Sequence, residues 1–105
     1  MEQLMYIPFR CKIKMSWQEL SAINQMLGRI EVEPGLEYRA LIEWCIKKRM
    51  EYTRKLMNRK KEYSFTLNAQ DASMLSYAMW WNFTTADLYE RTIIHKITEA
   101  VDRVV

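Results

Sequence analysis

Apolar and polar residues alternate strictly in two short stretches of this chain. In residues 9–15 the apolar positions are Phe9, Cys11, Ile13 and Met15, and the positions between them are Arg10, Lys12 and Lys14. In residues 61–67 the apolar positions are Tyr63, Phe65 and Leu67, and the polar ones are Glu62, Ser64 and Thr66. A period of two is typical of a strand with one buried face. We predict that the two strands pair antiparallel, either within one chain or between two chains by swapping, because an isolated strand leaves its backbone polar groups unpaired.

A capped helix is predicted directly after each strand. Ser16 followed by Glu19 forms a capping-box signal, and Asn68 followed by Asp71 comes close to one with the shorter acid. The core positions of these helices are Leu20, Ile23 and Leu27 in the first, and Ala72, Leu75, Ala78 and Met79 in the second. Gly28 is expected to end the first helix, and Asn82, in a left-handed conformation, the second.

A longer helix is expected after each of these. The first runs from about Leu36 to Asn58, after a loop in which Pro34 suits a first helical turn. Its length is roughly 33 Å, and its second half keeps only a thin apolar seam of Met50, Leu56 and Met57. The last helix is predicted to be capped by Thr84 or Thr85. Its expected core stripe is Tyr89, Ile93, Ile97, Ala100, Val101 and Val104.

These elements occur twice at a constant offset of 52 residues. Cys11, Ile13 and Met15 fall on Tyr63, Phe65 and Leu67, and Leu36 falls on Leu88. We therefore predict one domain over residues 1–105, built from two βαα repeats at about 9–58 and 61–104. Two repeats can cover apolar faces that one would leave open. The alternative is a chance similarity between two amphipathic segments. The expected fold class is mostly α with a two-stranded antiparallel ribbon.

The composition of the chain limits the classes of protein to which it can belong. The chain has 105 residues, of which 50% are hydrophobic, enough for one core. No apolar run approaches the roughly 20 residues of a membrane span and no signal pattern opens the chain, so we expect a cytoplasmic protein without a membrane partner. Cys11 and Cys45 both take inward positions, which favours buried free thiols over a disulfide or a metal pair.

Positive charge is concentrated in the first part of the chain. Residues 1–61 contain 13 Lys and Arg against 7 Asp and Glu, a net charge of +6, whereas residues 62–105 have a net charge of −3. The run from Lys47 to Lys61 holds eight basic residues and one acid. Such an imbalance indicates a polyanionic partner. The alternative is a solvated helix C-terminus, where cations favour the helix dipole.

The succession of a strand, a capped helix and a second helix within about 45 residues resembles the ribbon-helix-helix (Arc/MetJ-type) family. The residues that carry the resemblance are FRCKIKMSWQEL with the helix from Leu36, and EYSFTLNAQDASML with FTTADLYERTI. Members pair their strands into a ribbon that enters the DNA major groove and reads base edges. Two copies imply a single-chain pseudo-dimer whose function is double-stranded DNA binding, as a regulator of transcription or an accessory factor.

The resemblance implies a set of DNA-binding residues. They are Arg10, Lys12, Lys14, Ser64 and Thr66 on the ribbon, Thr84 and Thr85 at the last helix, and the cations Arg54, Lys55, Arg59, Lys60 and Lys61. Acidic residues depart from the family pattern, namely Glu31, Glu33 and Glu37 near the first long helix and Glu62 on the ribbon. Pro34 and Gly35 replace a Ser/Thr cap there. These departures argue against symmetric DNA binding, and the alternative is that one half binds DNA while the other is structural. The expected DNA site is not a palindrome, because the two strands present different outward residues to the two half-sites.

Several of these residues also fit functions other than DNA binding. The strand cations can instead prevent edge pairing. The aromatic residues Trp44, Trp80, Trp81, Tyr77 and Phe83, with the eight methionines, are typical of core or of a protein-binding surface. Of the consecutive pair Trp80 and Trp81, one is expected to be exposed. The single histidine, His95, has no second ligand for a metal site, and no catalytic set or phosphate loop can be assembled, so no enzyme, metal or cofactor is expected. The runner-up is a protein-interaction module that keeps the fold without binding DNA.

Overall fold

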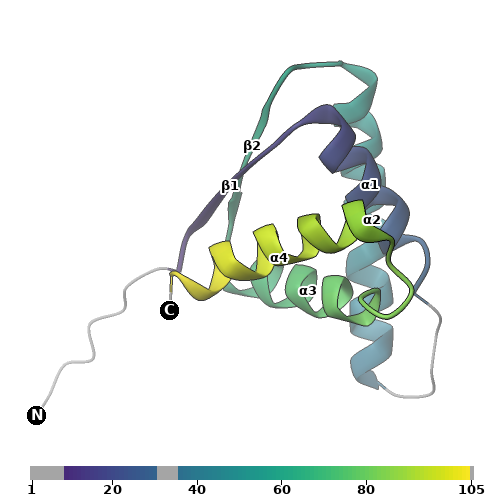
Figure 1. Ribbon diagram of the computed structural model, residues 1–105. Helices are drawn as coiled ribbons and strands as arrows, with labels where there is room; N and C mark the ends of the chain where they lie inside the picture. Colours follow the sequence, from purple (N-terminus) through teal and green to yellow (C-terminus); the bar gives the residue numbers. More distant parts are fainter. Residues whose placement is uncertain (1–8, 31–35, 105) are drawn as a thin grey trace, which may run out of the picture.

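The computed structural model describes residues 9–30 and 36–104, which form two strands and four helices (Figure 1). In chain order the elements are β1 (Cys11–Met15), α1 (Trp17–Leu27), α2 (Leu36–Met57), β2 (Tyr63–Leu67), α3 (Ala69–Trp81) and α4 (Leu88–Asp102). The mostly helical class and the two-stranded antiparallel sheet are confirmed. Each strand begins two residues later than the alternation suggested. Among the described residues no helix is both long and apolar enough to cross a membrane.

β1 and β2 pair with each other inside the one chain. The central pair is Ile13 with Phe65, flanked by Cys11 with Leu67 and by Met15 with Tyr63. Every second side chain of both strands is buried and the others are exposed. Burial of one face specifies this register, because a shift of one residue would turn the lysines of β1 into the core.

The capping signals of α1 and α3 act as predicted. The Ser16 hydroxyl accepts a hydrogen bond from the Glu19 N–H at 3.1 Å, and the Asn68 side chain accepts one from the Asp71 N–H at 2.8 Å. Of these two helices, α1 has the complete capping box, since the Glu19 carboxylate also accepts from the Ser16 N–H at 2.9 Å. Gly28 ends α1 as expected.

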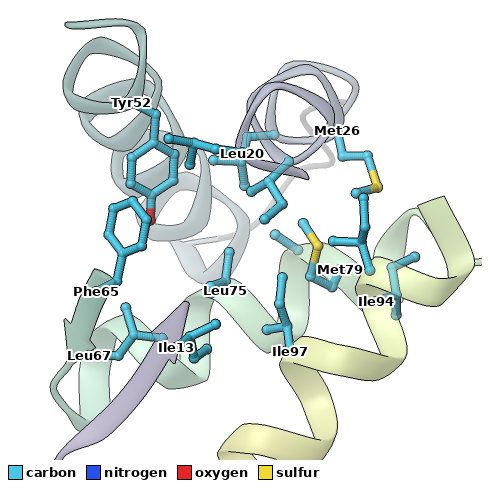
Figure 2. Packing of buried hydrophobic residues seen from close by; sticks show 14 of the residues in the cluster. Ile13, Leu20, Met26, Tyr52, Phe65, Leu67, Leu75, Met79, Ile94 and Ile97 are labelled. Carbon is cyan, nitrogen blue, oxygen red and sulfur yellow. The ribbon is translucent and has the colours of Figure 1, made fainter. Parts of the chain in front are cut away.

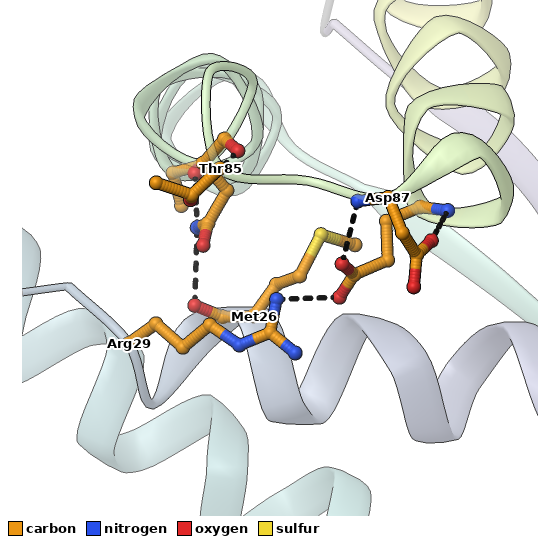
Figure 3. A network of polar contacts seen from close by, with 7 residues as sticks. Met26, Arg29, Thr85 and Asp87 are labelled. Atoms are coloured by element: carbon orange, nitrogen blue, oxygen red, sulfur yellow. Dashed lines mark hydrogen bonds and ion pairs between the residues drawn. The ribbon is translucent and has the colours of Figure 1, made fainter.

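The start of α4 differs from the prediction, which was wrong in choosing Thr84 or Thr85 as the cap. Asp87 caps the helix: its carboxylate accepts from the Glu90 N–H at 2.8 Å, and the Glu90 carboxylate accepts from the Asp87 N–H at 3.1 Å (Figure 3). The Thr85 hydroxyl instead donates to the Asn82 carbonyl. Arg29 fixes this arrangement from outside the helix, because its guanidinium lies 2.6 Å from the buried Glu90 carboxylate.

Asn82 ends α3 in a right-handed conformation, with φ of −82°, so the predicted left-handed stop is also wrong. Its side chain is completely buried and donates to the carbonyls of Met26, at 3.1 Å, and Ala78, at 2.9 Å (Figure 3). One amide group therefore joins the C-terminal ends of α1 and α3. This contact between distant segments holds the turn after α3 in place, although Asn82 does not adopt a positive φ.

The core draws side chains from both strands and all four helices (Figure 2). The predicted inward positions of α1 and α3 are all buried. The predicted seam of α2 is wrong in part, because Met50 and Met57 are 58% and 82% exposed. Tyr52 is buried in their place, since it follows Cys45 by two helical turns and packs edge-on against Phe65 at 5.4 Å between ring centroids. In α4 the predicted Tyr89 and Val104 are exposed, whereas Ile94 is buried.

The 52-residue spacing relates many structural features of the two halves. It maps the central pair of Ile13 and Phe65 onto itself and exchanges the two flanking pairs. It also relates the caps Ser16 and Asn68, as well as the first residues of α2 and α4. Residues Glu31, Glu33, Pro34 and Gly35, and the side chain of Glu37, lie outside what the structure describes.

Candidate nucleic-acid interface

The ribbon has one face against the helices and one face open. Figure 1 shows β1 and β2 at one side of the helical body, with no described helix across their outer side. We call the exposed residues of this side the outer face: Arg10, Lys12, Lys14, Glu62, Ser64 and Thr66. The buried side chains between them join the core, so the backbone directs the outer side chains to the open side of the ribbon. The structure thus brings all five ribbon residues that we predicted to contact DNA onto one surface.

The two strands contribute different chemistry to the outer face. Across the ribbon Lys12 pairs with Thr66, and Lys14 with Ser64, so cations lie on β1 and hydroxyls on β2. Glu62 lies 3.7 Å from the Lys14 ammonium, and both side chains are more than half exposed. An exposed ion pair of this kind contributes little to stability and breaks readily.

A groove runs between β1 and the C-terminal part of α4. Its cations are Lys12, Lys14, Lys61, Lys96 and Arg103, and its acids are Glu19, Glu62 and Glu99. Each of these acids already has a cation within 4.0 Å: Lys96 for Glu19, Lys14 for Glu62 and Arg103 for Glu99. The groove therefore keeps an excess of positive charge, with Lys61 at the end where β2 begins.

Glu19 is held ionised in this groove. Burial tends to raise the pKa of its carboxyl group, but the hydrogen bond from the Ser16 N–H and the ion pair with Lys96 outweigh burial and lower the pKa below its ordinary value. Lys96 contacts both carboxylate oxygens at 3.0 Å. Glu19 thus serves both the cap of α1 and the contact between α1 and α4.

Of the two cations at the end of α2, Lys55 lies next to β2, against a side chain of its buried face. Arg54 and Lys55 are exposed in the last turn of α2, and the Lys55 ammonium lies 5.5 Å from the centroid of the Phe65 ring. Arg59, Lys60 and Lys61 follow in the connection to β2. They line a hollow together with Trp17 and Gln18. Lys61 also lines the groove beside β1, so the two concave surfaces adjoin at this residue.

Thr84 and Thr85 are not brought to the ribbon. The Ala100 carbonyl, near the C-terminal end of α4, accepts a hydrogen bond from the Cys11 thiol at 3.4 Å. The first residue of α4 lies twelve residues earlier along the helix axis, ~18 Å away. In addition, the Asp87 carboxylate occupies that helix N-terminus and would repel a phosphate. These two threonines are therefore left out of the interface.

Sequence reasoning missed three residues beside the ribbon: Trp17, Lys96 and Arg103. The lysine and arginine belong to α4, in the half of the chain with net negative charge, so composition directed attention away from them. Only the packing of α4 along β1 brings them to the groove. Trp17 follows the cap of α1 directly, a position that the helical pattern alone does not mark as functional.

A second exposed surface is aromatic. Trp80 is 50% exposed, and its ring lies 5.2 Å from Phe83 and 6.2 Å from His95, measured between centroids. Trp44 is buried and Trp81 is partly buried against the core. The expectation that one of the two consecutive tryptophans is exposed is therefore confirmed.

The two cysteines are free and buried, as predicted. Burial raises the pKa of both thiols, that of Cys45 to about 11, although the nearby Arg49 lowers it somewhat. Within residues 9–30 and 36–104, no three His, Cys, Asp or Glu side chains gather in a metal-binding cluster. No family model, curated protein or solved structure matches this chain.

Proposed function

We propose that the protein is a tandem ribbon-helix-helix pseudo-dimer that binds double-stranded DNA through the outer face of its ribbon. The observation that carries the proposal is the pairing of β1 with β2 inside one chain, with the apolar side in the core and the polar side open. The 52-residue relation between the two halves supports the pseudo-dimer, because it makes the ribbon two-fold symmetric about Ile13 and Phe65.

The dimensions and chemistry of the outer face suit a DNA groove. The major groove of B-DNA is about 12 Å wide and admits a two-stranded ribbon. Arg10 can donate two hydrogen bonds to one guanine, and Ser64 and Thr66 can bond to several base edges. Lys12 and Lys14 supply charge for phosphates, whose counterions are released on binding.

The bound site should consist of unlike half-sites. A symmetric dimer mirrors its two-fold axis in a palindrome. Here the equivalent outward positions carry different residues, Lys12 against Ser64 and Lys14 against Thr66. Selection from a random duplex pool is expected to return a sequence without inverted symmetry.

The test is fluorescence anisotropy with a labelled duplex, measured from 50 to 200 mM salt, on the parent and on Arg10→Ala/Lys12→Ala/Lys14→Ala. The triple variant should bind at least tenfold more weakly, with the log–log salt slope smaller by about one unit for each lost phosphate contact. The matched control is Arg39→Ala/Lys47→Ala/Arg91→Ala, which removes the same charge from exposed helix positions. Equal loss in both variants would indicate attraction by net charge alone. A parent protein that binds no duplex at 50 mM salt would refute the proposal.

The exposed aromatic cluster favours a second candidate, a protein-interaction module. Large exposed aromatic side chains are enriched in protein–protein interfaces. Trp80→Ser should leave duplex binding unchanged if the ribbon carries the function. If the parent shows no DNA binding, a partner captured by the parent and lost with Trp80→Ser would support this second candidate.

A further inference from the structure

The connection between α2 and β2 holds three consecutive cations in one place at one end of the ribbon. We call Trp17, Gln18, Arg59, Lys60 and Lys61 the basic corner, since they line one hollow. All three cations are exposed. The corner adjoins the ribbon end at which Met15 pairs with Tyr63.

Aromatic residues keep this connection ordered. The Arg59 guanidinium lies over the Trp17 ring, 4.6 Å from its centroid, and the Trp17 indole N–H donates to the Leu56 carbonyl at 3.0 Å. Tyr63 is buried, its hydroxyl donates to the Asn58 carbonyl at 2.9 Å, and it accepts from the Lys60 N–H at 3.1 Å. The backbone that carries the cations is thus anchored on both sides, which reduces the entropy lost when they bind a ligand.

The opposite end of the ribbon lacks this construction. The residue that corresponds to Trp17 at the 52-residue spacing is Ala69, and the one that corresponds to Tyr63 is Cys11. Among the described residues, the cations near that end are Arg10 on the strand and Arg103, which follows Ala100, the α4 residue in contact with Cys11. The acid of the adjacent α3 cap, Asp71, contacts Trp44 and Lys48 on α2, and neither of these residues belongs to the outer face.

We propose that the basic corner is a phosphodiester clamp that grips the DNA backbone on one flank of the site only. This inference rests on the proposed function, because the duplex must lie on the outer face for the corner to reach the adjacent backbone. Lys61 lines both the corner and the groove beside β1, so a strand leaving the ribbon at this end passes next to the three cations. The protein therefore binds DNA in one fixed orientation, with most phosphate contacts on the flank beside the corner.

The experiment uses the selected duplex with uncharged methylphosphonates in place of phosphates on either flank. For the parent, neutralising one flank should weaken binding about tenfold and neutralising the other less than threefold. In Lys60→Gln/Lys61→Gln the two flanks should become equal. This variant keeps Arg59 on Trp17, so the fold of the connection is retained, and circular dichroism verifies it.

The orientation of the protein on the duplex is measured independently by tethered iron–EDTA cleavage. The exposed Asn58 and Gln70 lie next to opposite ends of the ribbon, and each can carry the reagent as Asn58→Cys or Gln70→Cys. The native thiols are buried and protonated, so they do not compete. Cleavage from position 58 should fall on the phosphate-sensitive flank and cleavage from position 70 on the other. Equal sensitivity of both flanks in a parent that binds would overturn the clamp and leave the proposed function standing, whereas absence of binding would remove both.

Discussion

The two halves of this protein share a backbone plan and differ in nearly every polar contact built on it. Each half has a strand of five residues, a side-chain cap three residues before an acid, and a second helix that begins 20 residues after that cap. In the first half the strand exposes lysines, and in the second a serine and a threonine. The shared features are those that bury apolar area or satisfy backbone groups, and the divergent ones face solvent.

One pair of equivalent contacts shows the difference at atomic scale. Glu19 of the α1 cap accepts from Lys96 on α4, and at the 52-residue spacing Asp71 of the α3 cap accepts from the indole of Trp44 on α2, at 3.0 Å. Both contacts join a cap to the long helix of the other half. The packing of the helices determines where each contact forms. The donor is a lysine ammonium in one contact and a neutral tryptophan indole in the other.

The largest expected effect comes from removing equivalent core side chains. Ile23 and Leu75 are both 0% exposed and occupy the same position in the two halves. Ile23→Ala and Leu75→Ala should each lower the free energy of unfolding by about 2–5 kcal/mol, through lost burial and the cavity left behind. Urea denaturation should show a single transition for both. Separate transitions for the two halves would contradict a shared core.

The next largest effect is expected at the amide that joins α1 to α3. Asn82→Ala removes two buried hydrogen bonds and leaves the Met26 carbonyl without its amide donor, so stability should fall by about 1–3 kcal/mol. Ile30 is the equivalent residue of the first half and is buried by apolar contact. The lower stability of Asn82→Ala should appear in both thermal and urea melts. The slope of the unfolding free energy against urea concentration should change little. A loss under ~0.5 kcal/mol would show that these hydrogen bonds do not hold the two helix ends together.

The two cap contacts should differ in their response to salt and pH. Trp44→Phe should cost about 1.5 kcal/mol by removing a hydrogen bond to a charged group, with little salt dependence. Lys96→Ala should cost about 0.5 kcal/mol and less at high salt, because the Lys96 side chain is 42% exposed.

The pH dependence of the Lys96 contact follows from Glu19. The folded pKa of Glu19 is lowered, so its contribution is complete above its ordinary value of 4.5 and is lost as pH falls through the folded pKa. The difference between the parent and Lys96→Ala should therefore shrink in that acid range. Melting curves between pH 7 and pH 3 measure it, and a difference that stays constant would assign the contact to packing alone.

The smallest effect on stability is expected where the two strands differ most in charge. Glu62 and Arg10 are equivalent outward positions, and Glu62 is exposed. Glu62→Arg should change stability by less than ~0.5 kcal/mol, since the ion pair it removes is exposed. Duplex affinity should rise severalfold with a steeper salt slope, because a cation replaces an acid on the outer face. Unchanged affinity would show that this end of the ribbon stays away from DNA.

Local pattern was sufficient for much of the fold. Alternation located both strands and their buried faces, and Ser16 and Asn68 marked the helix starts, because a strand period and a cap depend on neighbouring residues only. The pairing of the two strands was predicted on a different ground, because an isolated strand leaves its backbone polar groups unpaired. The strands and the caps, though not the pairing of segments 52 residues apart, follow from short segments of the chain taken one at a time.

Contacts between distant segments determined most of the features of the fold that local pattern did not predict. Thr84, Thr85 and Asp87 can all cap a helix, and Glu90 three residues after Asp87 is a local capping-box signal that the prediction missed. The distant contribution is Arg29 from the other half, which pairs with the buried Glu90 carboxylate. Tyr52 rather than Met50 is buried because of where α2 meets β2. The basic corner joins Trp17 at the start of α1 to Arg59 in the connection after α2, far apart along the chain. No local pattern encodes such a meeting, because burial and charge at these positions depend on how whole elements pack.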